Sequence, residues 1–212
     1  MSLSLAERVD PRRSILLVVD MQKDYCNPKG TAAGRGRDLT FVQEMMPNLL
    51  RLIEAARRHN FPVCFVRTIA NEWTNSPVWT EFKDNNNLAV AEGSAGAEFC
   101  TGFEPKRGDL VITKHRYSAF IGTNLDQILR CRDINSLIVT GVGTGMCVFQ
   151  TLAVGFMLDY YITLVEDCAA TSYGRQSHDE AVAHIKKHFA VVTSSSEIID
   201  TWSRAERRVS NL

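Results

Sequence analysis

The chain has 212 residues, of which 45% are hydrophobic and 23% charged, an ordinary composition for a globular domain. Basic and acidic residues number 24 each, so no excess charge attracts nucleic acid or an anionic membrane. No apolar run approaches the roughly 20 residues of a membrane span, and residues 15–19 are too short a run for a signal peptide. We therefore expect a single domain, residues 1–212, in a soluble cytoplasmic protein.

Six apolar runs recur along the chain without alternating polar residues, which is typical of strands buried on both faces of a parallel sheet. They cover residues 14–20, 62–68, 109–115, 136–142, 160–167 and 189–194. Helical patterns lie between or after them, at 47–59, 123–132, 146–158, 177–188 and 194–207. This alternation predicts an α/β fold with right-handed crossovers.

Two local signals refine this pattern. Ser177 with Glu180, and Ser194 with Glu197, have the spacing of a capping box and predict the starts of the last two helices. Residues 69–107 form the one long irregular stretch, and a connection of that length usually serves function or forms a lid.

The six cysteines are widely spaced and contain no C-x-x-C pair, which argues against a zinc site. Without a secretion signal, a disulfide framework is not expected either, so most should be reduced and buried. Cys147 differs from the others because it opens a helix directly after the glycine-rich segment GVGTG.

Three polar residues stand where a parallel sheet places its site, beyond the carboxyl ends of strands: Asp20, Lys114 and Cys147. Taken singly, Asp20 can cap a turn and Lys114 can extend to solvent. Together they can form a nucleophilic site, in which the helix N-terminus and Lys114 stabilise a Cys147 thiolate and Asp20 carries protons. The glycines allow backbone N–H groups to approach a substrate oxygen.

The segments VVDMQKDY, KHRYSAF and TGVGTGMCVFQT resemble the three signatures of the isochorismatase-like cysteine hydrolases, over about residues 14–194. The resemblance implies a three-layer fold with a six-stranded parallel sheet in the order 3-2-1-4-5-6 and helices on both faces. It implies a catalytic triad of Asp20, Lys114 and Cys147. It also implies a cis peptide bond between Val142 and Gly143, an oxyanion hole formed by the N–H groups of Gly143 and Cys147, and a homo-oligomer, dimer or tetramer.

Departures from the patterns of individual branches narrow the expected reaction. The segment RTIANEWTNSPVWTEF lacks the histidines of the metal set of nicotinamidases, and Cys147 argues against the vinyl-ether hydrolysis of true isochorismatases. The segment KHRYSAF, followed by TNLDQILR, resembles most closely the ureidoacrylate amidohydrolases, N-carbamoylsarcosine amidases and biuret hydrolases. We therefore expect an amidohydrolase without cofactor or metal, which cleaves a small amide or ureido compound through a thioester and releases ammonia. The alternatives are a nicotinamidase, an isochorismatase-type hydrolase or a non-catalytic member of the fold.

Two further interpretations are weaker. GVGTG resembles a dinucleotide-binding fingerprint, but Met146 stands where the third glycine is needed. His178, His184 and His188 lie on one predicted helix and can be imagined as metal ligands, although a solvated basic face is the simpler interpretation.

Several residues are candidates to surround the substrate. Tyr25 is expected to line the pocket, and Trp73 and Trp79 to belong to a lid or a subunit interface. Arg67, Arg116 and Gln150 are candidates to bind a polar or anionic end of the substrate. Tyr117 and Phe120 are expected to pack behind Lys114.

Overall fold

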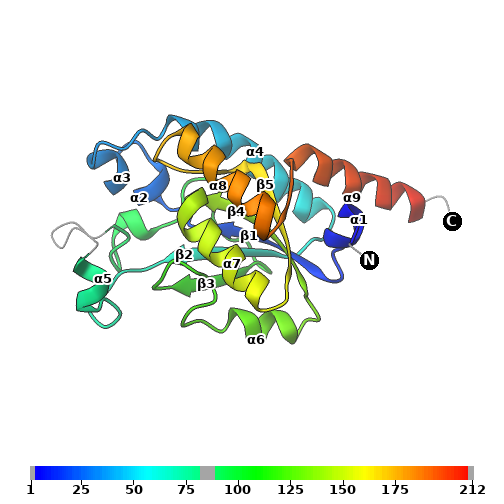
Figure 1. The fold of residues 1–212 in the computed structure, drawn as a ribbon, viewed down its shortest axis with the longest axis horizontal. Helices are drawn as coiled ribbons and strands as arrows, with labels where there is room; N and C mark the ends of the chain where they lie inside the picture. The colour runs from blue at the N-terminus through cyan, green and yellow to red at the C-terminus, as the bar shows by residue number, and fades with distance from the viewer. Residues whose placement is uncertain (1–2, 82–88, 210–212) are drawn as a thin grey trace.

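The computed structural model describes residues 3–81 and 89–209. Its centre is an all-parallel sheet in the order β3-β2-β1-β4-β5-β6, so the predicted α/β fold and strand order are confirmed (Figure 1). The strands match the six apolar runs closely: β1 (Ser14–Val19), β2 (Val63–Thr68), β3 (Leu110–Lys114), β4 (Ser136–Val142), β5 (Tyr161–Ala170) and β6 (Val191–Thr193).

Helices cover both faces of the sheet because its central strands are apolar on both sides. Every residue of β1 is buried; Leu16 and Val18 face one core, and Leu17 and Val19 face the other. The first core is completed by α4 (Thr40–Arg58) and α9 (Ser195–Val209), with α1 (Leu5–Arg8) packed beside α9. The second core is completed by α6 (Leu125–Arg130), α7 (Phe149–Met157) and α8 (Arg175–His188).

The five predicted helix starts differ from the observed ones by one to seven residues, and the structure explains two of these differences. Helix α4 begins at Thr40 rather than at residue 47, because buried Val42 and Met45 continue its apolar face ahead of Pro47, which lies inside the helix. Helix α8 begins at Arg175, after Gly174 at a φ of 91°, so the capping box predicted at Ser177 and Glu180 is wrong.

The capping box predicted for the last helix is confirmed. The Ser194 N–H donates to the Glu197 carboxylate at 3.1 Å, and the Glu197 N–H donates to the Ser194 hydroxyl oxygen at 3.3 Å. Helix α9 follows directly, from Ser195.

Five short elements gather at the carboxyl ends of the strands, toward the left of Figure 1. Helices α2 (Lys23–Cys26) and α3 (Thr31–Gly34) follow β1, while α5 (Pro77–Glu81) and the 3₁₀ helix η1 (Ala95–Ala97) belong to the long connection after β2. A π-helical turn, η2 (Thr144–Val148), follows β4. No helix among the described residues is long and apolar enough to cross a membrane.

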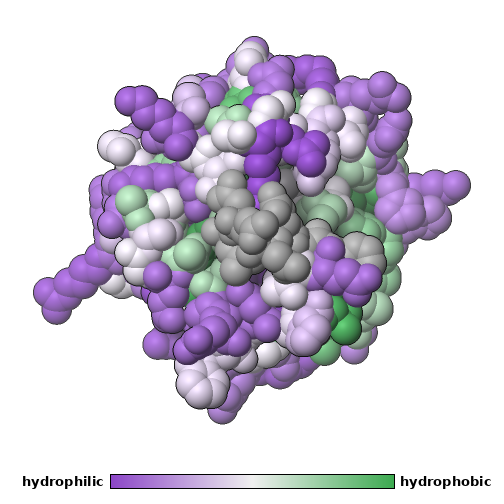
Figure 2. All heavy atoms as spheres, turned by 90° about the vertical axis from the view of Figure 1, so that its left-hand side faces the viewer, coloured by the Kyte–Doolittle hydropathy of each residue, from purple (hydrophilic) through white to green (hydrophobic). Residues whose placement is uncertain are grey.

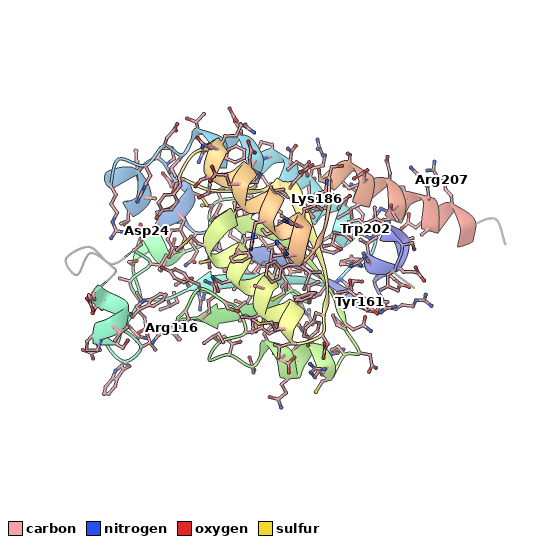
Figure 3. All side chains as sticks on the ribbon, viewed as in Figure 1. Asp24, Arg116, Tyr161, Lys186, Trp202 and Arg207 are labelled. Atoms are coloured by element: carbon pink, nitrogen blue, oxygen red, sulfur yellow. The ribbon has the colours of Figure 1, made fainter. Side chains whose placement is uncertain are left out.

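Buried polar side chains fix this end of the molecule. The Asp24 carboxylate accepts hydrogen bonds from the backbone N–H groups of Thr31, at 3.1 Å, and Val90, at 2.6 Å. The Gln22 side-chain amide donates to the carbonyl oxygens of Thr68 and Ala97, both at 2.8 Å. These bonds join the segment after β1 to the end of β2 and to the middle of the long connection, and Asp24 is labelled in Figure 3.

Candidate active site

Asp20 follows the last residue of β1 and is the first residue of the site. Its φ of 55° lies in the left-handed region, which aspartate and asparagine tolerate better than most residues. Its N–H donates to the Val66 carbonyl oxygen at 2.8 Å, which holds this backbone against β2. Its carboxylate is 1% exposed and accepts hydrogen bonds from Thr68 Oγ1 at 3.0 Å and Lys114 Nζ at 2.8 Å.

Lys114 ends β3 opposite Thr68 of β2 and is completely buried. Its ammonium lies 2.8 Å from Asp20 Oδ2, 2.6 Å from Thr68 Oγ1, 3.2 Å from the Arg116 carbonyl oxygen and 3.4 Å from Cys147 Sγ. Burial lowers the pKa of Lys114, but Asp20 and Cys147 raise it by more, so the net pKa lies above its ordinary value. Lys114 is therefore a permanent cation that links the carboxylate to the thiol.

The loop that carries Cys147 depends on a close approach between β4 and β1. Gly141 has a φ of 108°, and a Cβ at this position would lie 2.0 Å from the Val19 carbonyl oxygen. The peptide bond between Val142 and Gly143, which follows shortly after, is cis. Among the described residues, no group accepts a hydrogen bond from the Gly143 N–H, so it is available to a bound ligand.

Cys147 lies in the π-helical turn η2, just before the first residue of α7. Burial raises the pKa of the Cys147 thiol to about 12, with a further contribution from the Asp20 carboxylate, and the opposing effect of Lys114 is smaller. Burial and Asp20 therefore oppose the stabilised thiolate that the sequence suggested, and they favour the protonated thiol. Because Lys114 is already paired with Asp20, the two charges offset each other and the resting cysteine is a thiol.

Two adjacent chambers open from Cys147. The thiol chamber has a volume of about 160 Å³, and its lining includes Asp20, Arg35, Arg37, Gly143, Cys147 and Tyr173. The Trp79 chamber has a volume of about 90 Å³, and its lining includes Arg35, Thr68, Trp79, His115, Arg116 and Cys147. Figure 2 faces this end of the molecule, where many of the surface residues are hydrophilic.

The predicted substrate-binding residues divide into two groups. Tyr25 lines both chambers, and burial together with Asp20 raises the pKa of its hydroxyl. Trp79 and Arg116 line the Trp79 chamber, where the guanidinium carbon of Arg116 lies 4.9 Å from the centre of the Trp79 ring. Arg116 is labelled in Figure 3 at the same end of the molecule as Asp24.

Three of the candidates do not line either chamber. Trp73 is 89% exposed, and Gln150 is an exposed residue in the first turn of α7. Arg67 donates instead to Thr113 Oγ1 at 3.0 Å, across neighbouring strands β2 and β3. Tyr117 and Phe120, which were expected to pack together behind Lys114, lie in different places. Tyr117 lines both chambers, whereas Phe120 is buried against Tyr160.

His178, which was considered only as a third metal ligand beside His184 and His188, instead contacts the loop that carries Cys147. It is buried on α8, where its Nδ1 forms a hydrogen bond of 2.8 Å with Thr144 Oγ1 and its ring contacts Phe41. Burial lowers the pKa of His178 below its ordinary value. His178 therefore supports the first residue of η2 from behind.

Four polar residues of the site escaped the sequence analysis. Thr68 bridges Asp20 and Lys114, and a signal for it exists, because it closes the second apolar run just as Lys114 closes the third. Arg35 and Arg37 lie between predicted elements and Tyr173 follows β5, so no sequence pattern marked them. The described residues contain no cluster of three or more histidine, cysteine or acidic side chains arranged to hold a metal ion.

Comparison with known proteins places this geometry in a family. The model of the Isochorismatase domain matches residues 14–197. A cysteine hydrolase from Pseudomonas syringae pv. phaseolicola 1448A is 26% identical, with a TM-score of 0.84 over 97% of this chain and 100% of the other. N-carbamoylsarcosine amidase from Thermoplasma acidophilum is 27% identical, with a TM-score of 0.71 over 86% of this chain and 96% of the other. A nicotinamidase/pyrazinamidase from Bacillus subtilis, at 22% identity and a TM-score of 0.72 over 86% and 100% of the two chains, shares the fold. The chain belongs to the isochorismatase domain family of hydrolases.

Proposed function

We propose that this protein is a cysteine-dependent amidohydrolase that cleaves the C–N bond of a small amide or ureido compound and releases ammonia. The observation that carries the proposal is the buried chain of contacts from Asp20 through Lys114 to Cys147, with 2.8 Å between carboxylate and ammonium and 3.4 Å between ammonium and Sγ. A thiol beside a proton acceptor can carry out covalent hydrolysis of an amide, and a fixed cation can stabilise the negative charge that develops.

The first half of the reaction forms a thioester. Asp20 takes the proton of the Cys147 thiol as Sγ attacks the carbonyl carbon, so the carbonyl oxygen becomes an oxyanion. The N–H groups of Gly143 and Cys147 bind this oxyanion, and Lys114 stabilises the negative charge that develops near the sulfur. The tetrahedral intermediate then collapses, the C–N bond breaks, and protonated Asp20 gives its proton to the departing ammonia.

The second half returns the enzyme to its resting state. Asp20 removes a proton from water, the resulting hydroxide attacks the thioester carbon, and the C–S bond breaks. The proton on Asp20 passes to Sγ and restores the thiol. A resting thiol with a raised pKa suits this sequence, because the nucleophile is generated only as the substrate is attacked.

Two observations bear on the substrate class and on metal dependence. Similarity to an N-carbamoylsarcosine amidase at 27% identity favours a carbamoyl or ureido compound over nicotinamide. No histidine occurs in RTIANEWTNSPVWTEF, so we expect activity to survive chelation with EDTA.

We also infer that the protein forms a homo-oligomer. Light scattering at micromolar concentration tests this, and a monomer would contradict it.

The test is ammonia release over ureido acids, biuret, nicotinamide and simple amides, with three proteins. Wild type and Cys131→Ala, which changes an exposed cysteine away from both chambers, should release ammonia equally, and Cys147→Ala should lose at least about 10³-fold in kcat. Hydroxylamine should intercept the wild-type thioester, as a hydroxamate from an amide and as an N-hydroxyurea from a ureido compound. Full activity of Cys147→Ala, or no hydroxylamine adduct from any hydrolysed substrate, would overturn the covalent mechanism.

A further inference from the structure

Two cysteines that the proposed mechanism does not use have their thiols in contact. Cys26 ends α2, and Cys100 lies three residues after η1 in the long connection. Both are free thiols, and their side chains form a hydrogen bond with each other. Neither cysteine belongs to the described lining of the thiol chamber or of the Trp79 chamber, so this pair is a site apart from Cys147.

Backbone hydrogen bonds hold the two cysteines in place. The Cys26 carbonyl oxygen accepts a hydrogen bond from the side-chain amide of Gln43 on α4. The Cys100 N–H donates to the Met21 carbonyl oxygen at 2.9 Å, and the Cys100 carbonyl oxygen accepts from the Phe103 N–H at 2.9 Å. Both cysteines also belong to the same hydrophobic core, between the sheet and α4. The contact between the thiols is therefore fixed by the fold of the segments that carry them.

The surroundings make Cys100 the more reactive of the two thiols. The hydrogen bond from the Cys26 thiol lowers the pKa of Cys100, burial opposes this, and Lys23 helps to hold the net pKa below its ordinary value. The same hydrogen bond, together with burial, raises the pKa of Cys26. The thiolate is the form that attacks an oxidant. Cys100 is 5% exposed and Cys26 is 0% exposed, so a small oxidant from solvent meets Cys100 first.

We propose that Cys26 and Cys100 form a reversible oxidation site, at which a hydroperoxide converts the two thiols into a disulfide. In the first step the Cys100 sulfur attacks a peroxide oxygen, the O–O bond breaks, and Cys100 becomes a sulfenic acid while the hydroperoxide is reduced to an alcohol or water. In the second step the Cys26 sulfur attacks the Cys100 sulfur, the S–O bond breaks, and the hydroxyl leaves as water with the Cys26 proton. Two thiols and one hydrogen peroxide thus give one disulfide and two waters, and a thiol reductant reverses the change.

The disulfide would join the end of α2 to the long connection after β2. It would close a loop from residue 26 to residue 100, and a cross-link of that span stabilises a fold mainly by restricting the unfolded chain. We therefore expect oxidation to raise Tm by about 5–15 °C in a chain of this size. The cross-link would also anchor the segment that carries Tyr25, which lines both chambers.

The experiment treats the folded, reduced wild-type protein with a small molar excess of hydrogen peroxide. The protein is then unfolded, its remaining thiols are alkylated, and its peptides are identified by mass spectrometry. We expect one cross-linked pair of peptides, joined through Cys26 and Cys100, together with the rise in Tm, and dithiothreitol should reverse both. Cys64 on β2 and Cys168 on β5 are internal controls, because they are buried as well, and both should remain thiols that are alkylated after unfolding.

Three variants test the order of the steps. Cys26→Ala should leave Cys100 as a sulfenic acid, which dimedone traps, and Cys100→Ala should leave Cys26 reduced; neither should gain Tm on oxidation. Cys131→Ala, which changes an exposed cysteine, should behave as wild type. In the wild-type protein, a cross-link through Cys147, a sulfinic acid at Cys100 without a cross-link, or no oxidation of either cysteine would overturn the proposal. These measurements do not involve amide hydrolysis, so their outcome is independent of the proposed function.

Discussion

The ion pair between Asp20 and Lys114 leads to a prediction about stability that differs from the prediction about activity. Removing both charges should restore part of the stability that a single change loses, but no activity. Their 2.8 Å contact is sealed from solvent, since Lys114 is 0% and Asp20 1% exposed. Removing one partner of such a pair leaves an uncompensated buried charge, at a cost of about 3–5 kcal/mol. We expect Lys114→Met and Asp20→Asn each to lose about 3 kcal/mol of unfolding free energy. Asparagine is chosen because it tolerates the φ of 55° at position 20.

The double variant Asp20→Asn/Lys114→Met should be less damaged than its singles imply. It removes both charges together, and replacing a complete buried ion pair by neutral groups is often close to neutral. Its loss should therefore fall short of the sum of the single losses by at least about 2 kcal/mol. For a chain of this size, about 1 kcal/mol corresponds to 2–4 °C, so each single variant should lose about 6–12 °C in Tm.

Calorimetry and urea unfolding measure these losses, and ammonia release measures activity in the same preparations. All three variants should be inactive, because none retains both the proton acceptor and the cation. Arg130→Met is the control: it removes an ion pair with Asp126 whose partners are 58% and 39% exposed, and it should cost less than about 1 kcal/mol. A double variant as unstable as the summed singles would refute the coupling, and an active double variant would refute the catalytic assignment.

Three other predictions concern the groups around this pair. Burial lowers the pKa of His178, so the unfolded chain binds the proton more readily than the folded one. The stability that His178 contributes above the unfolded pKa of about 6.5 is therefore lost as pH falls through the folded value. His178→Gln should reduce the loss in Tm between pH 7.5 and 5.5, and an unchanged loss would contradict this. With the pKa of the Cys147 thiol at about 12, its alkylation by iodoacetamide, followed by peptide mass spectrometry, should keep rising about tenfold per pH unit through pH 9.5; a plateau near pH 8.5 would indicate an ordinary thiol. Gly141→Ala should cost more than about 3 kcal/mol in urea unfolding, because its Cβ would meet the Val19 carbonyl oxygen. Gly108 is the control, since it has a similar φ of 99° and no described atom within 4 Å of an added Cβ. Gly108→Ala should cost about 1–2 kcal/mol, and equal losses would show that the contact with Val19 does not matter.

The sheet could be predicted from the sequence because burial on both faces leaves a signal that is local and continuous. The run ILLVV is apolar at every position, and β1 covers it together with Ser14. Helix starts were less predictable because they depend on which of several capping options the tertiary structure uses. Ser177 and Glu180 have the right spacing, but Gly174 already turns the chain into α8 before them.

The clustering of the proposed reacting groups could be predicted for a related reason. Asp20, Lys114 and Cys147 each follow or close a strand, so the parallel topology brings them together at one edge. The protonation state of Cys147 could not be predicted in this way. It depends on whether Lys114 is free to stabilise a thiolate, and the pairing of Lys114 with Asp20 appears only in three dimensions.

The walls of the chambers are determined by contacts distant in sequence. Asp24 joins Thr31 to Val90, and the two arginines follow the α3 segment that this bond anchors. No periodicity marks such a connection, so Arg35 and Arg37 escaped notice while exposed Trp73 and Gln150 were selected on residue type alone.

The residues at the edge of the sheet and the residues that line the chambers have different chemical roles in the proposed reaction. Burial favours the neutral thiol of Cys147, and the charges of Asp20 and Lys114 offset each other, so the proposed reacting centre carries little net charge. An uncharged carbonyl carbon can approach Cys147 without an electrostatic penalty, and negative charge appears only during the attack, beside Lys114 and the Gly143 N–H. Selectivity for the rest of the substrate is then left to the chamber walls, whose described lining includes Arg35 and Arg37. A change in the segment after α3 can therefore alter which amide is bound without disturbing how its C–N bond is broken.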